Sequence, residues 1–161
     1  MADKNVLLEL QINFWRDNIR NSIMEALELM PEDKGDWIPA DNMIPLGQLF
    51  LHICETSDWW YDEIMKGNKA VELAVPGEKC PDKKVIKNHL EEHWKRLERF
   101  FAEPKEAFEK TYKREGSHEG RKWKIEQTGY WIFTHLFEHD IHHRSQINHY
   151  LRILGIRPPR I

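Results

Sequence analysis

Three histidines, an arginine and a glutamine lie within the eight residues HDIHHRSQ, 139–146. Histidine titrates near neutral pH, and its neutral ring is the commonest metal ligand in proteins. A cluster of this kind therefore indicates either a metal site or a hydrated, charged helix surface. The choice between them depends on which side of a helix each ring occupies.

Helix geometry places two of these histidines on a buried face. At about 100° per residue, His139 and His143 fall about 40° apart on a helix predicted over 128–154. They lie in the same apolar stripe as Leu136 and Ile147. Burying an imidazole costs free energy unless its ring nitrogens have polar partners, and one metal ion can bind both rings across a single turn. The alternative is that each ring is satisfied by a neighbouring side chain or by water.

A third ligand has to come from another helix, because two protein ligands rarely hold a catalytic metal. His52 is the best candidate, since it shares the inner face of a helix predicted over 46–65 with Thr56. Bundle metal sites are built from facing helices, so the separation in sequence is no obstacle. The predicted metal ligands are therefore His52, His139 and His143.

Other polar residues are predicted to surround these ligands. Gln146 faces the site and is expected to bond a ligand histidine or a substrate. His93, on a helix that Asp82 is expected to cap, is interpreted as a supporting donor or a satisfied core histidine rather than a fourth ligand. Arg144 is expected to point outward into a salt bridge, and Glu55 to be an exposed carboxylate. No side chain is assigned as catalytic.

The remainder of the chain predicts an all-α domain in which these histidines can meet. Apolar residues recur at three- and four-residue steps in segments that we expect to be helices. These segments cover about 8–30, 46–65, 82–103 and 128–154. Between the last two, Gly116 and Gly120 indicate the turn of a short β-hairpin. A four-helix bundle with long connections, forming one domain over 1–161, is the most economical arrangement.

Composition narrows the class of protein. Charged residues make up 32% and hydrophobic residues 40% of the chain, which is typical of a globular protein. A net charge of −3 argues against nucleic-acid binding. The sequence begins without the pattern of a signal peptide and holds no apolar run of roughly 20 residues, so we expect no membrane partner. A cytoplasmic location is the expectation.

Two of the predicted helices carry a second apolar strip on the side away from the histidines. A helix that is apolar on two sides is buried on two sides. We expect a homodimer to bury these strips; the alternative is that the hairpin or the long loops cover them. The strips consist of Phe50, Cys54 and Tyr61, and of Tyr130, Phe133, Phe137 and Ile141.

Together, HxxxHRSQ at 139–146 and LGQLFLHI at 46–53 resemble the DinB/YfiT superfamily. The last helix of its members typically reads HxxxHRGQ, often after another histidine four residues earlier, as His135 is here. The resemblance covers most of the chain and implies a four-helix bundle with one divalent metal on three histidines, which map onto the three predicted ligands. It makes His135 a further supporting candidate beside His93 and Gln146. Ser145 replaces the usual glycine, and Glu138 stands where asparagine is frequent, which puts the hydrogen bonds around the ligands in doubt.

The resemblance also implies a chemistry, because characterised relatives include transferases and isomerases that use low-molecular-weight thiols such as bacillithiol or mycothiol. Three neutral ligands leave a divalent ion its full charge and an open position, which favours activation of a coordinated water or thiol. We therefore expect a thiol-dependent transferase or a hydrolase of small molecules, with zinc or nickel, or else iron, as cofactor. The alternatives are a stress-associated or metal-binding helical dimer without catalysis, and histidines that merely satisfy one another.

Overall fold

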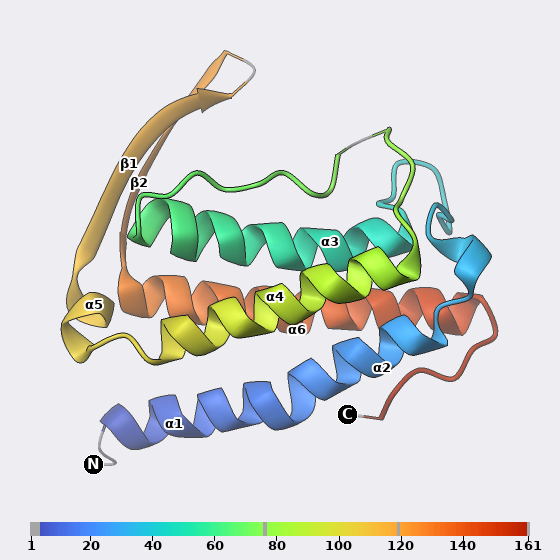
Figure 1. Ribbon diagram of the computed structural model, residues 1–161, viewed down its shortest axis with the longest axis horizontal. Coiled ribbons are helices and arrows are strands. Elements are labelled where there is room, and N and C mark those ends of the chain that lie inside the picture. Colours follow the sequence, from blue (N-terminus) through green and yellow to red (C-terminus); the bar gives the residue numbers. More distant parts are fainter. Residues whose placement is uncertain (1–3, 76, 119, 161) are drawn as a thin grey trace.

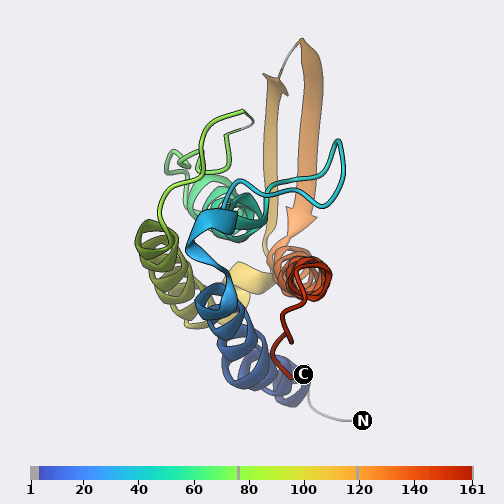
Figure 2. The same cartoon turned by 90° about the vertical axis from the view of Figure 1, so that its right-hand side faces the viewer.

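Four long helical segments lie side by side in the computed structural model, which describes residues 4–75, 77–118 and 120–160 (Figure 1 and Figure 2). The first is a continuous run of α1, a π-helical turn η1 and α2, and the second joins α3 to a longer π-helical stretch η3. The bounds are α1 Lys4–Phe14, η1 Trp15–Arg20, α2 Asn21–Leu29, α3 Leu46–Ser57, η3 Asp58–Met65, α4 Lys83–Phe101 and α6 Gly129–Ile153.

The predicted helices are confirmed close to their expected ends. Thr128 caps α6 by accepting a hydrogen bond from the Trp131 amide, at 3.2 Å. Asp82 does precede α4, but its side chain makes no capping bond, so the expected cap is wrong in detail. Two short helices, η2 (Glu32–Lys34) and α5 (Lys105–Glu109), were not predicted, because fewer than two turns leave no periodic pattern. Within the described ranges, no helix has the length and hydropathy needed to cross a bilayer.

The predicted hairpin is present and longer than expected. Strands β1 (Thr111–His118) and β2 (Arg121–Thr128) pair antiparallel and extend beyond the ends of the helices (Figure 1). Gly116 pairs with Trp123, whose indole ring lies across it. A β-carbon at Gly116 would come within 2.4 Å of that ring, so the position requires glycine.

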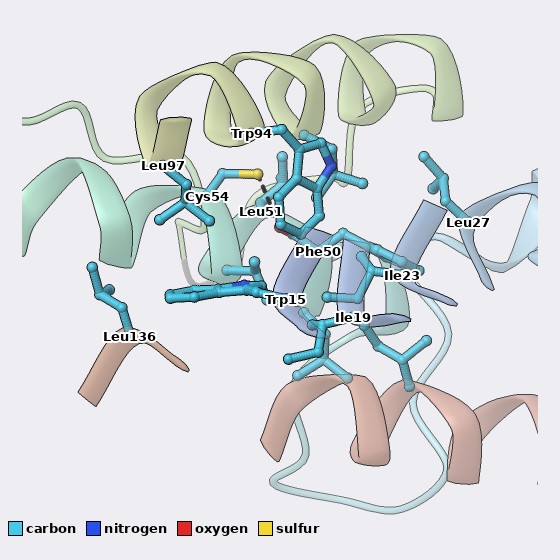
Figure 3. Close-up of a cluster of buried hydrophobic side chains, with 14 of the residues drawn as sticks. Trp15, Ile19, Ile23, Leu27, Phe50, Leu51, Cys54, Trp94, Leu97 and Leu136 are labelled. Atoms are coloured by element: carbon cyan, nitrogen blue, oxygen red, sulfur yellow. Dashed lines mark hydrogen bonds between the residues drawn. The ribbon is translucent and has the colours of Figure 1, made fainter. Parts of the chain in front are cut away.

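The core is formed by the apolar stripes of the long helices (Figure 3). The stripe predicted on the first segment is buried from Ile12 onward and partly buried at Leu8, with Trp15 and Ile19 at 1% and 0% exposure. They pack with side chains of α3 and α4. Within α3, the Cys54 thiol donates a hydrogen bond to the Phe50 carbonyl oxygen at 3.2 Å. This core fixes the α3 and α6 faces that carry the histidines.

Much of the second apolar strips is covered within the chain, which weakens the reasoning behind the homodimer. Tyr61 packs on Phe100 of α4, with ring centroids 5.2 Å apart. Phe133 of α6 packs on Trp15 and Phe100, with centroids 5.6 and 6.2 Å away. Helices of the same chain therefore bury the strip on α3 and η3 and Phe133 of the strip on α6, whereas Tyr130, Phe137 and Ile141 are only partly buried. The homodimer stays a prediction without that support.

Candidate metal centre

The structure brings the three predicted histidines together. Donor atoms of His52, His139 and His143 all lie within 4.8 Å of one another. His52 comes from α3, and the other two come from adjacent turns of α6. The Nε2 atoms of His52 and His139 are 3.2 Å apart, and the ring centroids of His139 and His143 are 4.3 Å apart. Below, these three residues are called the histidine triad.

Hydrogen bonds fix the orientation of two rings of the triad. Nδ1–H of His52 donates to Glu55 Oε1 at 3.0 Å, and Nδ1–H of His143 donates to Gln146 Oε1 at 2.7 Å. Because carboxylate and amide oxygens only accept, each contact places the proton on Nδ1. In the neutral ring this leaves the Nε2 lone pair free to bind a cation, in the way that polar partners commonly orient metal-binding histidines.

The third ring is backed by a buried carboxylate. Asp140 Oδ2 accepts hydrogen bonds from Trp15 Nε1–H at 2.8 Å and from His93 Nε2–H at 3.2 Å. Its Oδ1 atom lies 3.8 Å from His139 Nδ1, and among the described residues neither of these two atoms has a hydrogen-bond partner. Burial acts to raise the pKa of Asp140, but His93 and His139 outweigh it and leave the pKa below its ordinary value.

His93 extends this network away from the triad. It is fully buried, and its Nδ1 atom lies 2.7 Å from Ser57 Oγ. Arg96 donates to the same hydroxyl oxygen at 3.2 Å and pairs with Asp62 at 2.7 Å. His93 therefore lies outside the group of three and reaches it only through Asp140.

Burial also sets the charge of His143. Burial, followed by the neighbouring His139 and His52, lowers the pKa of His143 to about 3, so its ring is neutral at neutral pH. Burial and His139 likewise lower the pKa of His135. His135 stacks on Trp131 with centroids 4.9 Å apart and lies 6.1 Å from the His139 ring. It forms the rim of the site.

The donor set of the triad fits a divalent metal ion. With the Nδ1–H of His52 donated to Glu55, the Nε2 lone pair of His52 faces the Nε2 atom of His139 at 3.2 Å, a contact that is favourable only with a proton or a cation between the two nitrogens. Tetrahedral zinc bonds of about 2.0–2.1 Å would place two such nitrogens roughly 3.3 Å apart. Thr56 Oγ1, 3.2 Å from His139 Nε2, is the other polar atom at this point. Three imidazoles suit zinc, nickel, iron or copper.

Two of the expectations for side chains near the site were wrong. Glu55 was expected to be an exposed carboxylate, yet its side chain is 21% exposed, and Oε2 accepts from the Leu73 and Ala74 amides at 3.0 Å each. Burial acts to raise the pKa of Glu55, but the hydrogen bonds from His52 and these amides outweigh it and lower the pKa. The segment after η3 folds back along α3, which the helical wheel of α3 alone does not reveal.

Arg144 was expected to point outward, and it is 6% exposed without an ion-pair partner in the described part of the chain. It lies one turn after Asp140, whose side chain contacts Trp15 and His93 from other helices. Glu138, which the resemblance made a doubtful position, is exposed and makes no hydrogen bond to a described residue. It therefore leaves the contacts of the triad unchanged.

The sequence analysis missed Asp140 and Trp15 as parts of the site. Asp140 lies inside HDIHH and was passed over because it is not on the same face as His139 and His143. A signal was present, since Asp140, Arg144 and Asn148 recur at four-residue steps and form a polar row along the helix. All three are buried. Such a row indicates a polar network within a core.

Two open cavities reach the α3 side of the triad. One, of about 510 Å³, is lined by His52 and Glu55 together with the loop that precedes α3. The other, of about 470 Å³, is lined by Glu55, Thr56 and Trp59 together with the segment 70–72. Glu55 lines both, and a small molecule can reach the histidine triad at His52 from the first of them.

Comparison with known proteins identifies the family of this chain and solved structures with a similar fold. The profile of the DinB family matches residues 1–161. The crystal structure of a DinB-like protein from Bacillus subtilis is 25% identical, with a TM-score of 0.64, and covers 94% of this chain and 96% of its own. A DinB-like protein from Bacillus cereus is 17% identical, with a TM-score of 0.68 and coverage of 95% and 96%. A search among curated proteins finds no match to this chain.

Proposed function

Because this chain belongs to the DinB family, we propose that it is a divalent-metal-dependent enzyme, either a transferase that uses a low-molecular-weight thiol or a hydrolase. His52, His139 and His143 would hold the ion, with zinc or nickel as first candidates and iron next. One observation carries the proposal: three imidazoles from two helices converge, and an oxygen atom faces the Nδ1 atom of each.

A bound divalent ion would supply a Lewis acid that lowers the pKa of a coordinated water or thiol. The protein prepares the donors for it. His143, with a pKa of about 3, is already neutral at neutral pH, so a metal ion would not have to displace a proton from its Nε2 atom. Glu55 accepts a hydrogen bond from Nδ1–H of His52, and Gln146 accepts one from Nδ1–H of His143. These bonds keep both Nε2 lone pairs directed into the site.

The surroundings of the triad favour catalysis over a purely structural metal. The cavity of about 510 Å³ gives a small molecule access to His52, and the cavity of about 470 Å³ adjoins it at Glu55. A structural metal site is closed by four protein ligands, whereas three ligands leave a position for a reactant. Thiol transfer is the first candidate because of the superfamily resemblance, and hydrolysis is the second because the same ion activates water.

A screen of thiols against electrophiles, with ester and amide substrates beside it, tests the proposal. Protein loaded with zinc, nickel or iron should turn over at least one combination, lose this activity on chelation and regain it when the metal returns. The His139→Ala/His143→Ala variant should be inactive. Metal-loaded protein that neither conjugates nor hydrolyses any member of the panel would contradict an enzymatic role.

A further inference from the structure

The two cavities differ in the chemistry of their walls. The cavity of about 510 Å³ is largely apolar, since Ile38, Met43 and Ile44 line it next to His52. Tyr150 holds this loop in place by donating to the Ile44 carbonyl oxygen at 3.0 Å. A hydrocarbon group bound there would bury apolar surface close to the triad.

The cavity of about 470 Å³ combines an indole wall with carboxylates. Trp59 is half-buried, and Trp123 of the hairpin approaches it with ring centroids 5.9 Å apart. Glu55, Glu63 and Glu72 line the same space. An indole face beside carboxylates attracts a cation through the ring quadrupole as well as through charge.

The carboxylates of this cavity are not neutralised by ion pairs with lysine or arginine. Glu63 Oε2 accepts from the Ala70 amide at 2.9 Å, and Glu72 is exposed without a hydrogen-bond partner among the described residues. None of the described residues that line either cavity is a lysine or an arginine. Lys69 and Arg114 line a separate cavity, which Glu63 also lines.

We propose that the substrate of the metal centre carries an ammonium group on an apolar frame. The ammonium group would lie against Trp59, Glu63 and Glu72, and the apolar part would occupy the loop cavity beside His52. This inference rests on the proposed function, because it takes the histidine triad as the reacting centre. The carboxylates would also repel an anionic substrate. Recognition of a carboxylate generally uses arginine or lysine, and none of the described residues that line these cavities is either.

Calorimetric titration with three benzyl compounds tests the charge preference. Benzyltrimethylammonium, benzyl alcohol and phenylacetate share an aromatic frame and differ in charge, and the quaternary nitrogen cannot coordinate a metal. On metal-free protein the ammonium compound should bind about tenfold more tightly than the alcohol, and phenylacetate should bind most weakly. Equal or tighter binding of phenylacetate, or no binding of the ammonium compound at millimolar concentration, would overturn the inference.

Charge-neutral variants locate the preference. Glu63→Gln retains an oxygen for the Ala70 amide, and with Glu72→Gln it should reduce the preference for the ammonium compound at least about threefold. Glu91→Gln, an exposed position on α4, removes an equal charge elsewhere and should leave the preference unchanged. An unaltered preference in the double variant would overturn the inference. Because binding is measured without turnover, a failed activity screen counts against the proposed function and leaves this result standing.

Discussion

The histidine triad is held from two sides that differ in burial. On the His139 side, Asp140 is fully buried and bonded to Trp15 and His93. On the His52 side, Glu55 is partly exposed, lines both cavities and accepts backbone amides from the segment after η3. Each carboxylate thus faces one ring of the triad, but the two differ in the part of the protein to which they connect that ring. Asp140 connects the site to the buried core, and Glu55 connects it to the wall of the cavities.

Removal of the buried carboxylate should have the largest effect. Asp140→Ala leaves the Trp15 and His93 donors buried without an acceptor, so we expect the free energy of unfolding to fall by about 3–5 kcal/mol. Metal affinity should weaken by about 10–100-fold, because the His139 ring loses the carboxylate that faces it. Urea denaturation of metal-free protein and competitive metal titration measure the two effects. A loss of stability below about 1 kcal/mol would show that the network does not hold the core together.

Trp15→Phe removes one donor and keeps an aromatic ring in the core. Asp140 then retains His93 as its hydrogen-bonded partner, and we expect a loss of about 2 kcal/mol. Because the two residues share one hydrogen bond, the Asp140→Ala/Trp15→Phe variant should lose less stability than the sum of the single changes. Additive losses in urea denaturation would mean that the two side chains act independently.

Glu55→Ala should separate metal binding from stability. The Leu73 and Ala74 amides lie near the surface and can turn to water, so we expect a loss of about 1 kcal/mol. Metal affinity should still fall by about tenfold or more, because the Nδ1 proton of His52 loses its acceptor. If Glu55→Ala destabilises the fold as strongly as Asp140→Ala, the contrast between the two sides is wrong.

Acid should weaken the metal-free protein gradually. The pKa of His143 is about 3 in the folded protein against an ordinary value of 6.5, so between these values the unfolded chain binds the extra proton. The contribution of His143 is therefore complete above pH 6.5 and is lost as the pH falls toward 3, and the lowered pKa of His135 acts in the same direction. Urea midpoints at pH 7.5, 6 and 5 should decline, and His143→Gln should flatten the decline. An unchanged slope in that variant would contradict the assignment.

The helices and the triad could be predicted because they depend on local periodicity. The spacing of His139 and His143 on the apolar stripe of α6, and the face shared by His52 and Thr56, determine which rings point inward. Long amphipathic helices then allow few arrangements in which those faces do not meet.

Predictions failed where a second segment decides the environment of a side chain. The wheel of α6 placed Arg144 outside, but it is buried one turn after Asp140, which contacts Trp15 and His93 from other helices. The exposure of Glu55 depends on the segment that follows η3, and the role of Asp140 depends on Trp15, 125 residues earlier in the chain. Such long-range contacts produce no periodic pattern in the sequence around either residue, so the sequence does not indicate them.

Metal content tests the central claim most directly. Purified protein titrated with zinc and freed of excess should retain close to one ion per chain by elemental analysis. The His139→Ala/His143→Ala variant should retain none, whereas His142→Ala/His149→Ala, which removes two exposed histidines from the same helix, should retain the full amount. Equal metal content in both variants, or none in the unaltered protein, would contradict the account.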